Sequence, residues 1–315
     1  MQDRRTRRTI GILWYPGAQA AAVYGLRDLF DAADRLHAGR PTPPPRLEVQ
    51  QWHAEGGLTR PDAALDALVV PPSLVGSVVP DHGRPLAAWI AGRHREGTTL
   101  CSACVGSFLL AETGLLAGRP ATTHWALRDQ FAARFPDVIL DTDRLVIDDG
   151  DIITAGGVMA WVDLGLRIVE RFLGPAAMLT TARYLLVDPG GREQRFYSTF
   201  APTLTHGDAA VLRAQHWLRS QAHRKVTLTM MAARAGLGER TFIRRFHKAT
   251  GLRPTEYVQQ LRVGKARETL ETSNLTVDEV AYRVGYEDPG AFRKVFLRWM
   301  GLSPGEYRRR FAVRR

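Results

Sequence analysis

Cys104 is the residue of this chain best placed to do chemistry. It lies in the segment SACVG (residues 102–106), after an apolar run that predicts a strand and before one that predicts a helix. A reactive side chain on a sharp strand-to-helix turn is the arrangement known as a nucleophile elbow. Small neighbours let the turn close, and the positive end of the helix favours the thiolate. The sequence therefore predicts a candidate thiol nucleophile at position 104.

His124 is the candidate partner of that thiol. It lies in the segment ATTHW (residues 121–125), which the next strand could bring beside Cys104. A cysteine and a histidine within hydrogen-bond reach are the usual pair of a thiol enzyme. The alternative is a buried, inert cysteine near a histidine with a structural role. Spacing alone leaves both interpretations open.

The pair formed by Cys101 and Cys104 allows two further kinds of chemistry. A C-x-x-C pair is half of a zinc site, but the chain has only 2 cysteines and no second pair to complete it. The same spacing occurs in thioredoxin-type redox motifs, although Cys101 is expected inside the strand rather than on the exposed turn. We therefore expect no metal and keep a redox switch as an alternative. So few cysteines suit a reducing cytoplasm.

Alternating apolar runs predict the elements that position these residues. Buried strands are expected at residues 9–14, 46–53, 65–70 and 98–103, and helices at residues 20–36, 84–96, 105–113 and 158–172. Two further strands, at residues 145–147 and 152–154, flank Asp149-Gly150, which is a hairpin turn signal. Because strands and helices alternate, we expect an α/β domain with a parallel sheet sandwiched by helices.

The C-terminal part of the chain contains one unit twice. The segment GLRPTEY (residues 251–257) returns as GLSPGEY (residues 301–307), and the aromatic pair at 242 and 246 returns at 292 and 296. Each copy is typical of a short helix, a glycine turn and a second helix, as in a helix-turn-helix motif. A helix expected at residues 255–272 would hold the two second helices about one duplex turn apart, roughly 34 Å. We expect this part to be all-α.

The second helix of each copy combines an apolar face with a basic face. We expect Phe242, Ile243 and Phe246 to be buried in the first copy. The polar side chains of both helices are the candidate DNA-binding residues: Arg240, Thr241, Arg244, Lys248, Arg293, Lys294 and Arg298. The alternative is a helical bundle whose basic face is merely solvated. The length of the repeat and the segregation of charge favour DNA binding.

Charge separates the two parts of the chain. Residues 206–315 contain 22 Lys and Arg against 10 Asp and Glu, whereas residues 1–205 contain 21 against 22. The net charge of +11 therefore lies on the repeat region, as expected when only one domain meets a polyanion. No apolar run approaches the length of a membrane span. We expect residues 1–8 to form a basic tail before the first strand, with a signal peptide as the alternative.

Residues from about 208 to 311 resemble the DNA-binding domain of AraC/XylS-type transcription regulators. The resemblance rests on RVxxAR (262–267), VAxxVGY (280–286) and GLSPxxY (301–307). It implies promoter binding through two helix-turn-helix units. The second recognition helix begins Pro289-Gly290-Ala291, where the family usually has a serine. These three side chains cannot hydrogen-bond a base edge, so we expect the first helix to read bases and the second mainly to hold phosphates.

Residues 9–190 resemble the PfpI-type, class I glutamine amidotransferase-like domain, in the version fused to AraC-type domains in GlxA-type regulators. The resemblance rests on CVGxFxLAxxGLLxG (104–118), ATTHW (121–125), TAGG (154–157) and Asp163-Leu164. It implies a flavodoxin-like or glutamine amidotransferase-like fold. Hydrolytic members of this superfamily use an elbow cysteine, a histidine and an acid, which is often a glutamate just after the first strand.

The match to the hydrolytic members is incomplete. Cys104 and His124 match, but residues 15–19 offer no carboxylate. The glycine pair that is usual after the strand at 65–70 is Pro72-Ser73 here, and Pro72 has no N–H to donate to an oxyanion. We therefore assign no catalytic residue and expect Cys104 and His124 to line a ligand-binding pocket.

Together these observations predict a ligand-responsive, DNA-binding transcription regulator. Its parts are a basic tail at 1–8, a sensor domain at 9–190, a linker at 191–207 and a DNA-binding domain at 208–315. The expected partners are promoter DNA, a small effector that the resemblance suggests is nitrogenous, a second copy of the chain, and RNA polymerase if the protein is an activator. No cofactor is expected. The alternatives are a cysteine-dependent amidase or hydratase fused to a DNA-binding domain, and a thiol redox-sensing regulator.

Overall fold

The computed structural model describes residues 7–38, 45–54, 64–75 and 80–313. The chain forms two compact units, Met1–Gln194 and Arg195–Arg315. Their boundary lies inside the range 191–207 that the sequence predicts as a linker. Most of the expected basic tail lies outside the described residues. Within the described ranges, no helix combines the length and the apolar character needed to cross a bilayer.

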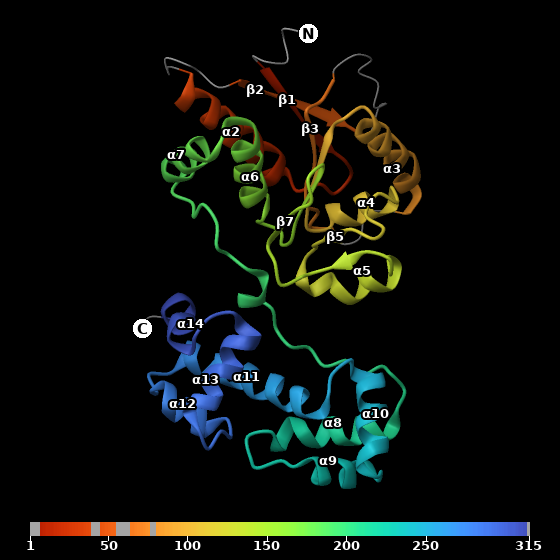
Figure 1. Cartoon of the computed structure of the whole chain (residues 1–315), viewed down its shortest axis with the longest axis vertical. Helices are drawn as coiled ribbons and strands as arrows, with labels where there is room; N and C mark the ends of the chain where they lie inside the picture. The colour runs from red at the N-terminus through yellow and green to blue at the C-terminus, as the bar shows by residue number, and fades with distance from the viewer. Residues whose placement is uncertain (1–6, 39–44, 55–63, 76–79, 314–315) are drawn as a thin grey trace. The chain divides into compact units, whose positions relative to one another are not determined.

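A six-stranded sheet forms the centre of the first unit (Figure 1). In spatial order its strands are β2 (Arg46–His53), β1 (Arg7–Trp14), β3 (Ala67–Val70), β4 (Thr99–Ala103), β8 (Ile152–Ala155) and β7 (Val146–Asp148). Neighbouring strands pair in parallel except β7, which is antiparallel to β8. The predicted parallel sheet is confirmed, and the hairpin at Asp149-Gly150 adds one antiparallel edge strand.

Helices cover both faces of this sheet. The first layer contains α2 (Ala20–His37), α6 (Trp161–Leu173) and α7 (Pro175–Leu185), and the second contains α3 (Pro80–Arg95) and α4 (Gly106–Glu112). Alternate residues of β4 face opposite layers, since Cys101 packs in the first core and Leu100 in the second. The sequence did not predict α7, although Gly174-Pro175 is a helix start signal.

A small ribbon lies beyond the elbow helix. Its strands β5 (Pro120–Ala121) and β6 (Ile139–Leu140) pair in parallel and are joined through α5 (Arg128–Arg134). Phe108 of α4 packs edge-on against Phe131 of α5, with ring centroids 4.9 Å apart. Strands of two residues have no periodicity to detect, so the sequence does not predict this ribbon. The ribbon fixes the segment that carries His124.

All the regular elements of the second unit, among its described residues, are helices. Its helices are α8 (Ala209–Gln221), α9 (Leu228–Ala235), α10 (Glu239–Thr250), α11 (Pro254–Thr272), α12 (Val277–Arg283), α13 (Pro289–Met300) and α14 (Pro304–Phe311). The two predicted helix-turn-helix units are confirmed as α9 with α10 and α12 with α13. Each has its own core, one around Phe242 and Phe246 and the other around Phe292 and Phe296.

Local signals set the ends of these helices. Thr276 and Glu279 form the predicted capping box, and Asp288 accepts hydrogen bonds from the first free N–H groups of α13. The glycine turns have positive φ, 72° at Gly236 and 97° at Gly285. A helical φ is negative, so both helices stop there.

The prediction that Ile243 is buried is wrong. Ile243 is 37% exposed, whereas Phe242 and Phe246 are fully buried. Successive residues of a helix are rotated by about 100° from one another, so residue 243 leaves the face that 242 and 246 define. The exposed side of α10 therefore includes one apolar side chain among its cations.

The segment between the units has packed ends. A 3-10 turn spans Gln194–Phe196, and both Gln194 and Phe196 are buried. Gln194 belongs to the first unit and Phe196 to the second. The range expected as a linker is therefore anchored on both sides of the division.

Candidate functional site

The turn at Cys104 has the geometry of an elbow. Its φ is +54°, a left-handed conformation that is uncommon for a residue with a side chain. The Cys104 N–H donates to the carbonyl of Ala155 at 2.8 Å, which ties the turn to the neighbouring strand. Gly106 must be glycine, because a Cβ there would lie 2.6 Å from the carbonyl oxygen of Val70. The small residues of the sequence motif thus have the predicted physical role.

The sulfur of Cys104 lies in a closed environment. The residue is only 2% exposed, and this burial raises its pKa to about 11, opposed by a hydrogen bond from the Val105 backbone. The sequence predicts that the helix N-terminus favours the thiolate. Burial outweighs that effect, so the group is a neutral thiol at neutral pH. In this state it is a poor nucleophile.

Tyr15 occupies the position after β1 where a glutamate would be expected in a hydrolytic relative. It is buried, and its hydroxyl donates to the carbonyl of Pro71 at 2.7 Å. Burial raises the pKa of Tyr15, and the neighbouring Cys104 raises it further. The carbonyl of Pro72 accepts a hydrogen bond from the Gln19 backbone at 2.7 Å. This corner of the site therefore supplies neither an acid nor an N–H from residue 72.

His124 lies near the elbow, but no hydrogen bond joins its ring to Cys104 in the described structure. Its Nδ1 accepts a hydrogen bond from the backbone of Ala126 at 3.1 Å and so caps the 3-10 turn Trp125–Leu127. Partial burial lowers the pKa of His124, which keeps the imidazole neutral at pH 7. Thr123 makes the direct contact instead, because its hydroxyl donates to the Cys104 carbonyl at 2.8 Å.

Gln194 has a role in this region that the sequence does not predict. It is 2% exposed, and its Nε2 lies within 3.0 Å of the Thr122 hydroxyl and of the carbonyls of Thr123 and Arg144. Its Oε1 accepts from the Trp125 backbone at 3.0 Å. A single glutamine in a polar stretch gives no signal of this role. The last residue of the first unit is thus tied to the segment that contacts the elbow.

The described residues place no metal-binding group at the elbow. Among the described residues, no group of three or more His, Cys, Asp or Glu side chains is arranged to hold an ion. Cys101 is fully buried within β4, and burial raises its pKa to about 12. A thiol in that state does not ligate a metal or exchange disulfides readily.

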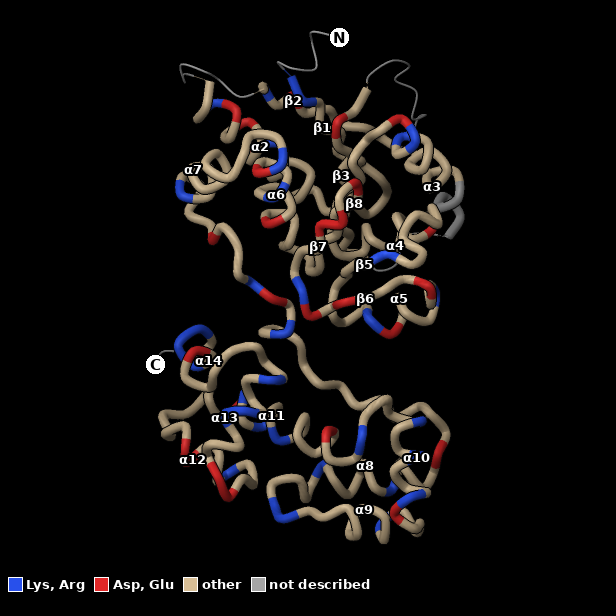
Figure 2. The backbone as a smooth tube through the Cα atoms, in the orientation of Figure 1, with Lys and Arg blue, Asp and Glu red and all other residues tan. Residues whose placement is uncertain are grey.

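The first recognition helix, α10, has an open cationic face. The side chains of Arg240, Thr241, Arg244 and Lys248 are all exposed. In the described structure none of the four makes a side-chain hydrogen bond or an ion pair. Figure 2 shows Lys and Arg along α10. Groups that are already solvated and unpaired can turn to a phosphate or a base edge without breaking another contact.

The second recognition helix, α13, differs in this respect. Arg293 is paired with Asp278 of α12, and Arg298 lies 3.4 Å from Glu256 while its guanidinium stacks over Trp299. Lys294 is exposed and has no such partner among the described residues. The seven candidate residues are thus brought onto two equivalent helices, but only those of α10 and Lys294 are unpaired.

Two family models match the chain. The one described as a helix-turn-helix domain covers residues 231–310, and the one described as the DJ-1/PfpI family covers residues 59–171. These ranges contain both recognition helices and the elbow, respectively.

Three curated relatives are HTH-type transcriptional regulators. CdhR of Pseudomonas aeruginosa is 28% identical over 71% of this chain and 66% of its own length. ArgR of the same organism is 26% identical over 95% of this chain and 92% of its own length. GlxA of Rhizobium meliloti is 30% identical over 69% of this chain and 67% of its own. With an elbow domain followed by two helix-turn-helix units, the chain belongs to the AraC-type transcriptional regulators that carry a DJ-1/PfpI-type N-terminal domain.

Proposed function

We propose that this regulator binds promoter DNA in response to a small effector sensed by its first unit. The observation that carries the DNA-binding part is the face of α10, where three unpaired cations and a threonine are exposed on a recognition helix. The excess positive charge of the second unit supports the same interpretation, because phosphate contacts dominate the affinity of such domains for DNA.

The two recognition helices are proposed to make different contacts with DNA. Arg240, Thr241 and Arg244 of α10 read bases, and Lys248 holds the backbone beside them. On α13, Arg293, Lys294 and Arg298 mainly hold phosphates, because the first turn of that helix offers only Pro289-Gly290-Ala291 to the groove. The pairing of two of these three arginine and lysine side chains with acidic groups supports a weaker contribution from α13.

The elbow is proposed to be a sensing site rather than a catalytic one. A neutral buried thiol, a neutral histidine engaged with its own backbone and the absence of a carboxylate at residues 15–19 argue against turnover. Cys104 and His124 would contact the effector as part of its pocket. The resemblance to GlxA-type regulators favours a nitrogenous metabolite.

A contiguous set of hydrogen bonds offers a route from this site toward the second unit. Thr123 donates to the carbonyl of Cys104, and the Thr123 carbonyl in turn accepts from Gln194. Arg195, the next residue, is the first of the second unit. A ligand that shifts the elbow would therefore act on the residue where the units join. We propose that this shift changes promoter affinity in a dimer and, in an activator, contact with RNA polymerase.

The test uses the full chain, a duplex selected by it from random DNA, and a panel of amino acids, amines and betaines. A compound that binds only the folded state at 100 times its Kd adds about 2.7 kcal/mol of stability. This should raise Tm by several degrees, since 1 kcal/mol moves a domain of this size by roughly 2–4 °C. The same compound should change the Kd for the selected duplex.

Recovery of the compound separates a sensor from an enzyme. A hit that is recovered unchanged and alters DNA affinity would support the proposal. Consumption of the compound by the wild-type chain, but not by Cys104→Ser, would instead support the thiol enzyme fused to a DNA-binding domain. If no compound changed either Tm or DNA affinity, effector sensing at this site would be contradicted.

A further inference from the structure

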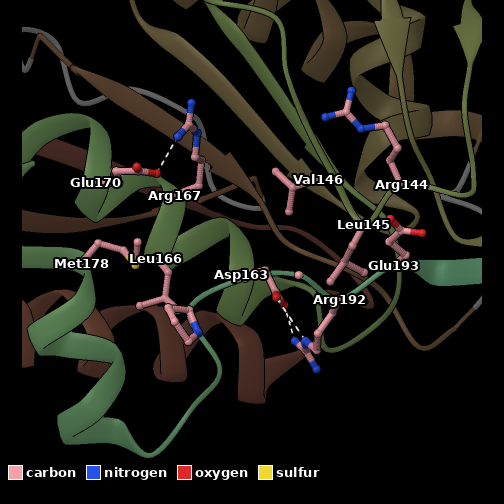
Figure 3. Close-up of a pocket in the computed structure, with 13 residues that line it drawn as sticks. Arg144, Leu145, Val146, Asp163, Leu166, Arg167, Glu170, Met178, Arg192 and Glu193 are labelled. Carbon is pink, nitrogen blue, oxygen red and sulfur yellow. Dashed lines mark hydrogen bonds and ion pairs between the residues drawn. The ribbon is translucent and has the colours of Figure 1, made fainter. Parts of the chain in front are cut away.

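A pocket separate from the elbow lies along one edge of the first unit. It has a volume of about 290 Å³ and lies between β7, α6, α7 and the segment 189–193 (Figure 3). This volume is at the lower end of the roughly 300–1,000 Å³ that small-molecule sites occupy. Neither Cys104 nor His124 lines it. The pocket therefore has its own chemistry, which its lining residues define.

The acidic groups of the pocket are all engaged. Asp163, whose side chain is only 7% exposed, pairs with Arg192, and Glu170 pairs with Arg167 at 2.5 Å. Glu193 also has a partner. A ligand cation would have to displace one of these partners before it met a carboxylate. The pocket as it stands therefore does not favour an amine.

Arg144 is different from the other charged residues of the pocket. Its side chain is exposed, and within the described part of the chain its guanidinium has no hydrogen-bond or ion-pair partner. Figure 3 shows Arg144 at the right near Leu145 and Glu193, the Arg167–Glu170 pair at the left, and the Asp163–Arg192 pair below them. A guanidinium presents a planar pair of donors that matches a carboxylate.

The rest of the lining is apolar. Leu145, Val146, Leu166 and Met178 contribute hydrocarbon and sulfur surface next to the charged rim. A ligand that satisfies both features has a single carboxylate for Arg144 and a compact apolar body for these four side chains. Burial of that body would add to the binding free energy of the carboxylate contact.

One wall of the pocket is the segment that leads out of the first unit. Gly190 and Gly191 both have positive φ, 150° and 79°, so this wall follows a path that other residues adopt with difficulty. The ion pair between Arg192 and Asp163 joins this wall to α6. Two residues further on, Gln194 is held by its buried hydrogen bonds. Whatever occupies the pocket touches this segment directly.

We propose that this pocket is a second ligand site, which takes a small apolar monocarboxylate and closes the segment 189–193 over it. The carboxylate pairs with Arg144, and the ligand packs between α6 and the segment. Occupancy of the pocket restricts the motion of the segment that leads into the DNA-binding unit. It therefore acts on the same conformational equilibrium as a ligand bound at the elbow, through ordering of the chain. Its regulatory consequence rests on the proposed function, but the binding itself does not.

Hydrogen exchange of the full chain tests the site with butyrate, isovalerate and benzoate as probes. At least one of them should slow amide exchange in peptides that cover residues 186–196. The corresponding amides, butyramide, isovaleramide and benzamide, should give no protection because they lack the charge. Arg144→Gln should weaken binding of the carboxylate by about tenfold or more, the value of a charge-assisted bidentate contact.

Matched variants separate the site from general charge effects. Arg128 of α5 is also exposed and outside the pocket, so Arg128→Gln should bind the probe as the wild type does. Met178→Trp should block binding by filling the pocket. Amide hydrogen exchange in β1 and β4 of this variant should equal that of the wild type, which would show that the unit is folded. Protection that persists in Arg144→Gln, or that the amides also give, would overturn the proposal.

The experiment also distinguishes this proposal from the proposed function. Absence of protection by all three carboxylates would overturn the second site, whereas the response of DNA affinity to the amine and amino-acid panel would be untouched. Conversely, protection at 186–196 without any change in DNA affinity would uphold the ligand site and contradict its regulatory consequence.

Discussion

At the scale of single residues, the contrast between α10 and α13 decides what each candidate DNA contact does. Arg244 is exposed and unpaired, and so is Lys294, but only Arg244 lies on the helix whose first turn has side chains that can reach base edges. Two exposed, unpaired cations are therefore expected to have different roles.

Arg244→Ala should weaken binding to the selected duplex by about 1–3 kcal/mol while it weakens binding to random DNA much less. Lys294→Ala should weaken both duplexes alike and reduce the slope of log K against log salt by about 1. Fluorescence anisotropy titrations at several salt concentrations measure both quantities. Arg128→Ala, in the other unit, is the control. If Arg244→Ala lowered the affinity for the two duplexes equally, the proposal that α10 reads bases would be contradicted.

The burial of Cys104 makes a second prediction at this scale. Its pKa in the folded chain, about 11, lies above the ordinary value of 9.0, so the unfolded chain loses this proton first as pH rises. The contribution to stability is therefore complete below about pH 9 and is lost as the pH rises toward 11, by up to roughly 2–3 kcal/mol.

Two measurements check this burial. Alkylation of the native chain by iodoacetamide should be very slow at pH 7.5, and the Tm of the first unit should fall between pH 9 and pH 10.5. Cys104→Ser, which does not titrate, should show a smaller fall over that interval. Rapid alkylation at pH 7.5 that Cys104→Ser abolishes would mean that the thiol is activated. It would then support the alternative of a cysteine-dependent enzyme fused to a DNA-binding domain.

At the scale of elements, two glycines of the second unit have opposite physical roles. Gly285 ends α12 with φ +97°, and a Cβ there would lie 2.6 Å from the carbonyl oxygen of His223. Gly264 lies within α11, and nothing is within 4 Å of where its Cβ would be. The first glycine is required by the turn between the two helices, whereas the second is a weak point in a helix.

Gly264→Ala should stabilise the second unit by up to about 1 kcal/mol, because alanine has the higher helix propensity. Gly285→Ala should destabilise it by more than that, since it adds both backbone strain and a steric clash. Urea unfolding followed by circular dichroism at 222 nm compares the two. A gain in stability from Gly285→Ala would show that this turn tolerates a side chain and would contradict the role assigned to its conformation.

At the scale of the whole molecule, Gln194 is the residue that anchors the end of the first unit, immediately before the second unit begins. Its amide joins the segment after β5, the segment before β7 and the chain that leaves the unit. Because all its partners are backbone or hydroxyl groups in a buried place, loss of the amide leaves several of them without a partner.

Gln194→Ala should lower the stability of the first unit by roughly 1–3 kcal/mol, the cost of leaving buried polar groups unsatisfied. It should also bring the DNA affinities measured with and without effector closer together. Gln130→Ala, at an exposed position of α5, should change neither. Lower stability together with an unchanged effector response would assign Gln194 a structural role only.

The sequence alone determined the features that depend on near neighbours in the chain. Helix caps such as Thr276 with Glu279, the glycine turns, the repeat of apolar positions and the small residues around Cys104 all act within a few residues. Local sequence patterns therefore predict their conformations. For the same reason the two helix-turn-helix units and the alternation of strands and helices along the first unit could be predicted, and their resemblance to known families could be recognised.

Only the tertiary structure decided the state of the residues at those positions. The pKa of Cys104 depends on how completely the folded unit excludes water from its sulfur, and the pairing of Arg298 depends on Glu256, 42 positions away. The role of Gln194 likewise depends on partners about 70 positions distant. Burial and long-range pairing arise from the closure of the chain on itself, so no local pattern contains them, and they determine which predicted site residues are free to act.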